Sequence, residues 1–313
     1  MESLLMASRV VLPMAMTVGI GMLLRMMKLT DGSAMKNVDK LIFHVFLPLL
    51  CFYNVYMTDF SKVTGPGYIL FGAGMVILLF LAGMLLVPLF VKPMPTAAAF
   101  GQTLFRTNYV IFGAAVAESI YGSGNFGLIS LLSAVIVPMF NGLAAVLLER
   151  ARNRSASAGK LLAAVIRNPT IIATLLGILF CLTGLRLPVP VPVLDVVQDL
   201  AGLTTPLSFL SIGVTLQLGR VQHKRYLFSG VVLRLVLIPL AILPMAIALG
   251  FRGQELCALM ILFAAPTAVS SYPMAAAMDA DGEFAAQMVA YTTVFCLPTI
   301  FLWTLFLNSM GWM

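Results

Sequence analysis

Charged residues are scarce in this sequence of 313 residues. Asp, Glu, Lys and Arg together make up 10% of the chain, whereas soluble proteins carry about 25%. Hydrophobic residues make up 61%, and they fall in runs of roughly 18 to 25 residues, each long enough to cross a bilayer. The composition predicts an all-α polytopic membrane protein. In such a protein the net charge of +7 reports loop orientation, so no nucleic-acid partner is expected.

The sequence also lacks the motifs of common enzymes. It contains no HExxH, no GxSxG and no glycine-rich phosphate loop. Its four cysteines lie in apolar runs without CxxC or Cys/His pairing, so neither disulfides nor metal sites are expected. We therefore expect no enzyme activity and no cofactor. Without an ATPase motif, any transport has to be secondary or passive. Carboxylates deep in the apolar runs are scarce, so no proton or sodium site is obvious.

Ten membrane spans are predicted. The chain begins without a basic region, and its apolar run continues to Leu24 without a cleavage site, so we interpret it as the first span and not as a signal peptide. The predicted spans are Leu4–Met26, Leu41–Met57, Tyr68–Val91, Ala97–Tyr121, Phe126–Leu148, Pro169–Leu185, Val196–Leu218, Tyr226–Leu249, Leu256–Met278 and Phe284–Leu307.

The longest polar segment divides these spans into two sets of five. It runs from Glu149 to Arg167. The predicted organisation is a first repeat at 1–149, a cytoplasmic linker at 150–167 and a second repeat at 168–313. Thirteen lysines and arginines fall in loops on one side, and only Lys62, Arg186 and Arg252 fall on the other. The basic side should be cytoplasmic, which places both termini in the periplasm or outside the cell.

Proline and glycine recur at matched places in the two halves. The spacing from Pro13 to Gly21 equals that from Pro169 to Gly177. Three further pairs follow in the same order, namely Tyr68/Gly72 with Tyr226/Gly230, Pro48 with Pro206, and Gly122/Pro138 with Gly282/Pro298. Because each half has an odd number of spans, the halves must insert with opposite topology. Inverted repeats of this kind are typical of secondary transporters.

Two stretches stand out, in the fourth and ninth spans. Residues 106–122 begin with Arg106 and Asn108 and carry Gly113 inside an apolar run. Residues 265–273 carry four further candidates, Pro266, Thr267, Ser270 and Ser271. Intramembrane charges and interrupted spans indicate broken helices that line a binding site. Two broken helices would direct two helix N-termini at one centre, and with Arg106 they would suit a carboxylate.

Each of these residues has a plainer interpretation. Pro266 is also compatible with an ordinary kink, and Asn108 with a hydrogen bond between packed helices. Arg106 lies close enough to the cytoplasmic end of its span to snorkel or to form a structural pair. For Arg234, at a similar depth, a structural role is favoured. Asn54 lies in an apolar span but has no place in the scheme of two broken helices.

The chain resembles the auxin efflux carrier family, in the bacterial branch that includes proteins called malonate transporters. The motifs that carry the resemblance are Asn168–Gly177, Pro206–Leu216, Phe46–Phe52 and the Asn-x-x-x-x-Gly of Asn108–Gly113. The family pattern continues Gly-x-Pro in the fourth span, but Ala115 stands where the proline would be. A proline-induced break is therefore absent there, and Gly113 would have to serve instead.

The resemblance implies two inverted five-helix repeats whose fourth and ninth helices are broken and cross. It implies a scaffold and dimer surface made by spans 1, 2, 6 and 7, and a moving transport domain made by the others. The expected function is a secondary transporter for a small organic anion such as malonate, working by an elevator mechanism in the bacterial inner membrane. Expected partners are the anion, the bilayer, a second copy of the chain and, as an open point, a coupling H⁺ or Na⁺. A receptor or scaffold without transport is the alternative, and an intramembrane enzyme is a third.

Overall fold

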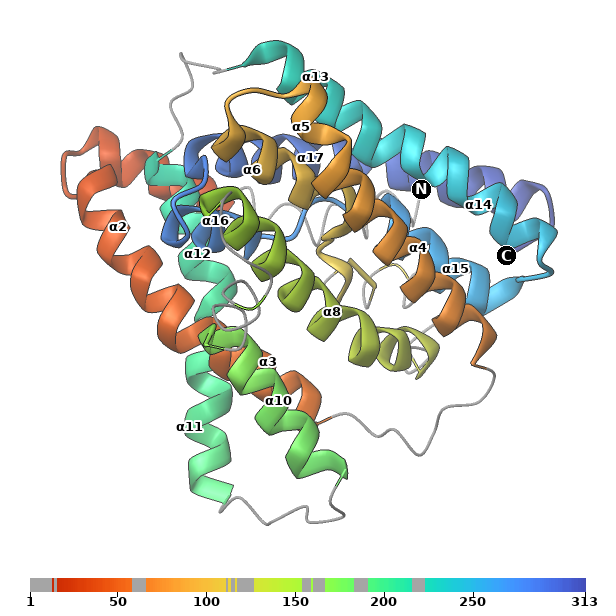
Figure 1. Ribbon diagram of the computed structural model, residues 1–313, viewed down its shortest axis with the longest axis horizontal. Helices are drawn as coiled ribbons and strands as arrows, with labels where there is room; N and C mark the ends of the chain where they lie inside the picture. Colours follow the sequence, from red (N-terminus) through yellow and green to blue (C-terminus); the bar gives the residue numbers. More distant parts are fainter. Residues whose placement is uncertain are drawn as a thin grey trace.

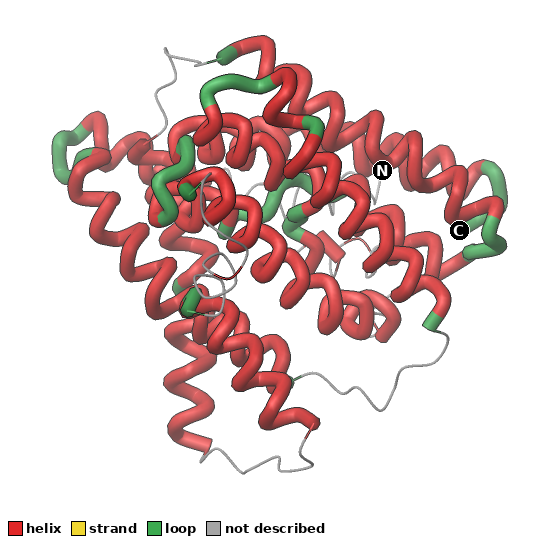
Figure 2. Tube along the Cα trace, viewed as in Figure 1, coloured by secondary structure: helices red, strands yellow, loops and turns green. Residues whose placement is uncertain are grey.

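The computed structural model describes residues 13, 16–57, 66–110, 112, 113, 116, 127–153, 159, 167–182, 191–215 and 223–313. In this part of the chain the regular structure is helical, with short loops at the helix ends (Figure 2). The helices are Met16–Met26, α2 Gly32–Leu41, the π-helix η1 Ile42–Phe46, α3 Leu47–Tyr56, α4 Gly67–Leu85, α5 Val87–Phe90, α6 Met94–Phe105, α8 Gly127–Arg152, α10 Pro169–Leu182, α11 Val191–Gly202, α12 Thr204–Thr215, α13 Lys224–Val232, the π-helix η3 Leu233–Leu237, α14 Ile238–Ala248, α15 Gly253–Ala264, α16 Ser271–Ala277 and α17 Gly282–Ser309.

Within the described residues helices lie in the predicted spans, and the helices of the second and seventh spans begin five or more residues earlier than predicted. The helix of the second span begins at Gly32, nine residues before the predicted Leu41, because the Asp31 side chain accepts hydrogen bonds from the backbone N–H groups of Ser33 and Ala34. Its first turns are amphipathic and polar, so hydropathy alone does not reveal them. The helix of the seventh span begins at Val191 and is interrupted at Leu203, between α11 and α12.

The described residues are consistent with a polytopic membrane protein. The segments Gly67–Phe90, Leu131–Arg152 and Lys224–Ala248 are each long and apolar enough to cross a membrane, and α17 joins them if its two bent parts count as one span. Large apolar side chains are exposed along the outer helices, as expected for surfaces in contact with lipid. The count of ten spans and the inverted repeat stay predictions.

The helices pack in two groups. Helices α3, α10 and α11 extend together at the lower left of Figure 1, and α12 packs against α2 in the same group. The second group consists of α4, α6, α8 and α13–α17. The groups touch at several places, where α3 and α10 meet α8, where α2 and α12 meet α16, and where α12 meets α17.

A glycine pair brings the helix Met16–Met26 against α12. A Cβ atom on Gly213 would lie 2.1 Å from the carbonyl oxygen of Val18, and one on Gly21 would lie 2.3 Å from that of Leu210. No side chain fits at these distances, so the two backbones pack directly against each other. Close backbone contacts through small residues are the usual way in which helices associate within lipid.

Both marked spans are broken, and the two breaks are hydrogen-bonded to each other. Helix α6 ends at Phe105, and Arg106 is extended. Helix α15 ends at Ala264, and Ala265 is extended. Thr107 and Thr267 form an antiparallel bridge. It is closed by the Asn108 N–H donating to Pro266 O at 2.9 Å and by the Ala268 N–H donating to Arg106 O at 3.2 Å. The break segments therefore run antiparallel, and each donates one backbone hydrogen bond to the other.

One side chain, Arg234 of η3, binds the open end of both helices. Its guanidinium donates from Nη1 to Leu104 O at 2.9 Å, from Nη2 to Leu262 O at 3.0 Å and from Nε to Ala265 O at 3.0 Å. In an unbroken helix, Leu104 O would accept from residue 108 and Leu262 O from residue 266. The Arg234 guanidinium supplies the hydrogen-bond donor to both carbonyls instead. Its positive charge lies at two helix C-termini, where it is favourable. The structural role predicted for Arg234 is thus supported by its contacts.

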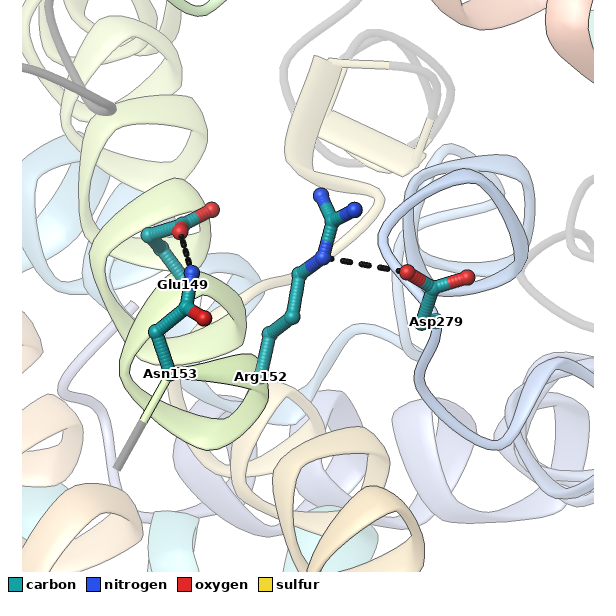
Figure 3. A network of polar contacts seen from close by, with 4 residues as sticks. All are labelled: Glu149, Arg152, Asn153 and Asp279. Atoms are coloured by element: carbon teal, nitrogen blue, oxygen red, sulfur yellow. Dashed lines mark hydrogen bonds and ion pairs between the residues drawn. The ribbon is translucent and has the colours of Figure 1, made fainter. Parts of the chain in front are cut away.

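Several loops predicted on one side of the membrane meet at one end of the molecule. Arg152, the last residue of α8, forms an ion pair with Asp279 at 3.0 Å, next to the contact between Glu149 and Asn153 (Figure 3). Thr96, at the start of α6, donates to Asp281 at 2.7 Å. The exposed ion pair contributes little stability, but these contacts agree with a common side for the ends of the predicted third, fifth and ninth spans.

The glycine contact predicts a sharp difference between two matched substitutions. Gly213→Ala forces its Cβ into the backbone of the facing helix, and we expect a loss of about 1 to 3 kcal/mol from overpacking. Gly74→Ala adds a Cβ that meets nothing within 4 Å, so it should gain roughly 0.5 to 1 kcal/mol from helix propensity. Thermal unfolding of both purified variants tests this. An equal or higher midpoint for Gly213→Ala than for the wild type would contradict the close backbone contact.

The contacts of Arg234 predict that its loss destabilises the fold. Arg234→Met leaves three buried carbonyls without their donor, and each charged hydrogen bond contributes about 1.5 to 3 kcal/mol. Arg252 also donates to two carbonyls but is exposed, so Arg252→Met should cost far less. Folded yield and unfolding midpoint, compared at equal expression, provide the measurement. If both variants are equally stable, Arg234 does not stabilise the two helix breaks.

Candidate functional site

A cavity of about 160 Å³ lies beside the two breaks, between the two groups of helices. Helices α3 and α12 of the first group form one side, and α8 with the break segments of the second group forms the other. The lining residues are Leu47, Leu50, Cys51, Asn54, Val137, Phe140, Asn141, Thr204, Thr205, Ser208, residues 106–110 and residues 268–270. Apolar walls with a few polar groups are typical of small-molecule sites.

Arg106 is fully buried at the base of this cavity. Nη1 donates to Gln102 Oε1 at 2.9 Å and contacts the sulfur of Met274 at 3.1 Å. Nη2 donates to Asn141 Oδ1 at 2.7 Å and to Ser270 Oγ at 3.0 Å. Only 1% of the residue is exposed. The possibility that Arg106 snorkels to the cytoplasmic surface is therefore wrong, because its guanidinium is held within the protein.

The charge of Arg106 faces neutral groups. Each of its four partners is an amide, a hydroxyl or a thioether, and none of the described residues that line the cavity is acidic. A buried cation is costly unless an anion compensates it. Arg234 obtains that compensation from helix C-termini, whereas Arg106 has its charge beside an open cavity.

Four residues that line the cavity carry a buried polar atom with no hydrogen-bond partner among the described residues. These atoms are Thr107 Oγ1, Asn108 Nδ2, Tyr109 Oη and Thr204 Oγ1. An orphaned buried polar atom costs about 1 to 3 kcal/mol, so natural proteins rarely retain one without a reason. Together with Arg106, these atoms form a set of donors suited to a ligand that accepts hydrogen bonds.

The structure brings together three of the seven predicted site residues. Arg106, Asn108 and Ser270 line the cavity. Pro266 and Thr267 belong to the bridge between the breaks, where Pro266 O accepts from Asn108 and the Thr267 N–H donates to Thr292 Oγ1 at 3.1 Å. Ser271 is buried at the start of α16 and does not line the cavity. These three residues shape the breaks and do not face the cavity.

The role expected of Gly113 is wrong. The helix breaks at 106–108, five residues before Gly113, which is itself helical. A Cβ on Gly113 would lie 2.7 Å from the Ile129 side chain, so this glycine allows close packing against α8. The break needs neither a proline nor a glycine, because Arg234 donates a hydrogen bond to Leu104 O in place of the next helical turn.

One of the two helix dipoles contributes less to the site than the sequence suggests. Helix α16 has only seven residues, and a dipole of this length supplies little of the half charge of a long helix. Among the described residues that line the cavity, the charged one is Arg106.

Sequence reasoning missed the polar residues that come from the other helices. Asn54 lines the cavity from α3, Asn141 from α8, and Ser208 with Thr205 from α12. Asn54 thus lines the cavity although it takes no part in the two breaks. The sequence signal that could have revealed these residues was their polarity inside apolar runs. Neutral polar residues also hold membrane helices together, however, and the sequence does not show which of them converge on one site. Within the described residues there is no group of His, Cys, Asp and Glu able to hold a metal ion.

Comparisons with known proteins point to membrane transport. The chain is 29% identical over 142 residues to an uncharacterized transporter of Methanothermobacter thermautotrophicus, a match that covers 44% of this chain and 45% of that protein. The sequence model of a family described as membrane transport protein matches residues 6–304. The chain therefore belongs to this family of membrane transport proteins.

Proposed function

We propose that this protein is a secondary transporter for a small mono- or dicarboxylate, malonate among them, and that the cavity at the two breaks is its substrate site. The observation that carries the proposal is the buried guanidinium of Arg106, whose partners are all neutral and which borders a cavity with no acidic residue in its described lining. A bound carboxylate offsets this charge and accepts charge-assisted hydrogen bonds. Asn108 Nδ2 supplies a further donor that lacks a partner.

The size of the cavity supports a small substrate. Its volume is about 160 Å³, and a cavity of about 150 Å³ accommodates benzene. A three-carbon dicarboxylate is of comparable size. One carboxylate group would lie at Arg106 and Asn108, and the second would face the hydroxyls of Thr204, Thr205 and Ser208.

The arrangement around the cavity supports alternating access. The cavity lies between the two groups of helices, so a displacement of one group along the other would carry Arg106 and Asn108 across the membrane. We assign the helix Met16–Met26, α2, α3 and α10–α12 to a scaffold and the remaining helices to a moving domain. The antiparallel bridge between the breaks supports two inverted repeats at 1–149 and 168–313 joined by a linker.

The remaining features of the proposal rest on the sequence. The distribution of basic loops favours periplasmic or extracellular termini in a bacterial inner membrane. The resemblance to auxin efflux carriers favours a homodimer formed through the scaffold. A receptor without transport would need neither paired breaks nor a cavity between two groups of helices.

Removal of the unpartnered amide predicts a loss of affinity. Asn108→Ala deletes a donor at the cavity, and we expect malonate to bind about 5- to 150-fold more weakly, equivalent to roughly 1 to 3 kcal/mol. Asn153→Ala is the matched control, because Asn153 contacts Glu149 at the surface, away from the cavity (Figure 3). Calorimetric titration of both variants measures the difference. Equal affinity of Asn108→Ala and Asn153→Ala would place the substrate elsewhere.

The charge of Arg106 predicts discrimination between an acid and its amide. Wild-type protein should bind malonate about 10- to 150-fold more tightly than malonamide, since one charge-assisted contact contributes about 1.5 to 3 kcal/mol. Arg106→Gln should lose most of this preference, because a neutral amide cannot compensate the carboxylate. Competition against labelled malonate uptake in proteoliposomes provides the readout. Equal competition by acid and amide in the wild type would refute the anion site, and binding without uptake would favour a receptor.

A further inference from the structure

A second polar centre lies away from the substrate cavity, around Asp39 of α2. Its carboxylate is buried, and each oxygen accepts a hydrogen bond. Ser211 Oγ of α12 donates to Oδ1 at 2.7 Å, and Tyr272 Oη of α16 donates to Oδ2 at 2.7 Å. The Tyr272 oxygen also lies 3.1 Å from Thr215 Oγ1 and 3.2 Å from Ser211 Oγ. Asp39 thus joins α2 and α12 of one helix group to α16 of the other.

Tyr272 connects this centre to the substrate cavity. Helix α16 begins at Ser271, and the residue before it, Ser270, lines the substrate cavity and accepts a hydrogen bond from Arg106. Tyr272 is two residues further along the chain. The contact between Asp39 and Tyr272 therefore fixes one end of the segment that forms the wall of the substrate cavity.

Water can reach the centre through a cavity of about 660 Å³ that Asp39 and Tyr272 both line. Charged groups from every side face this cavity. Arg25 comes from the first helix, Lys36 and Lys40 from α2, Asp279 from the turn after α16, and Glu283 from α17. The residues that α12 contributes to the centre, Ser211 and Thr215, do not titrate. A carboxylate that is buried yet borders water is accessible to protons.

Protonation would change the contact that holds α16. At acid pH a hydronium ion that enters the cavity transfers its proton to the Asp39 carboxylate, which gives the neutral acid and a water molecule. The Tyr272 hydroxyl then donates to a neutral acceptor, and a hydrogen bond to a neutral group is roughly half as strong as one to a charged group. Acid pH therefore weakens the attachment of α16 to α2, and alkaline pH restores it.

We propose that Asp39 is a proton-binding site and that Tyr272 and α16 convey its protonation state to the substrate cavity. The coupling to transport rests on the proposed function, whereas the proton site itself does not. Sequence analysis missed the site because Asp39 precedes the predicted second span and was counted with the polar loop. The centre explains how a carrier with few intramembrane carboxylates could use a proton gradient.

Hydrogen exchange of α16 tests the proton site without any substrate. After correction for intrinsic exchange rates, the amides of 271–277 in the full-length wild type should be about fivefold less protected at pH 5.5 than at pH 8, following the weakened bond. Asp39→Asn and Tyr272→Phe should abolish this pH dependence. Asp279→Asn, which alters an exposed carboxylate at the same cavity, should retain it. Protection that does not change with pH in the wild type, or that still changes in Asp39→Asn, would overturn the proposal.

A transport assay then tests the coupling. An acid-outside gradient should accelerate uptake of labelled malonate into wild-type and Asp279→Asn proteoliposomes and leave Asp39→Asn uptake unaccelerated. Acceleration of all three would refute coupling through Asp39. If no variant transports malonate, the proposed function fails for this substrate, and the exchange experiment still decides the proton site.

Discussion

The attachment of one guanidinium to two broken helices is the interaction on which the rest of this structure depends. Backbone groups inside a membrane must be satisfied within the protein. Arg234 replaces the helical donors to Leu104 O and Leu262 O, and the bridge between residues 107 and 267 satisfies the neighbouring groups. These contacts give hydrogen-bond donors to Leu104 O, Leu262 O, Arg106 O and Pro266 O where the chain leaves the helical conformation, and the freed segments form a wall of the cavity.

The two buried arginines of this region have opposite surroundings. Arg234 lies at two helix C-termini, whose partial negative charge compensates it. Arg106 is oriented by Gln102, Asn141 and Ser270, all neutral, and borders a cavity. The first arrangement suits a permanent structural role, and the second leaves a positive charge that a substrate can compensate. Residue type alone does not distinguish the two arginines, whereas their hydrogen-bond partners do.

Much of the fold could be predicted from the sequence, because apolar runs and the two interrupted spans are local features. The start of α2 could not, since its first turns are polar. Arg106, Asn108 and Ser270 were found by their polarity inside apolar runs. Asn54, Asn141 and Thr204 were not, because they come from three helices distant in sequence and their convergence depends on packing. Gly113 was given the wrong role since the donor that opens α6 is Arg234, about 130 residues away.

The central claim is that a carboxylate occupies the cavity beside the two breaks. The most direct measurement is the anomalous scattering of bromine in crystals of the full-length protein with bound 2-bromomalonate. The account predicts a bromine peak in the cavity between α3, α8 and α12, next to Arg106 and Asn108. This peak should be lost in Arg106→Gln crystals grown with the same ligand. A bromine site elsewhere in the molecule, with this cavity unoccupied at saturating ligand, would contradict the account.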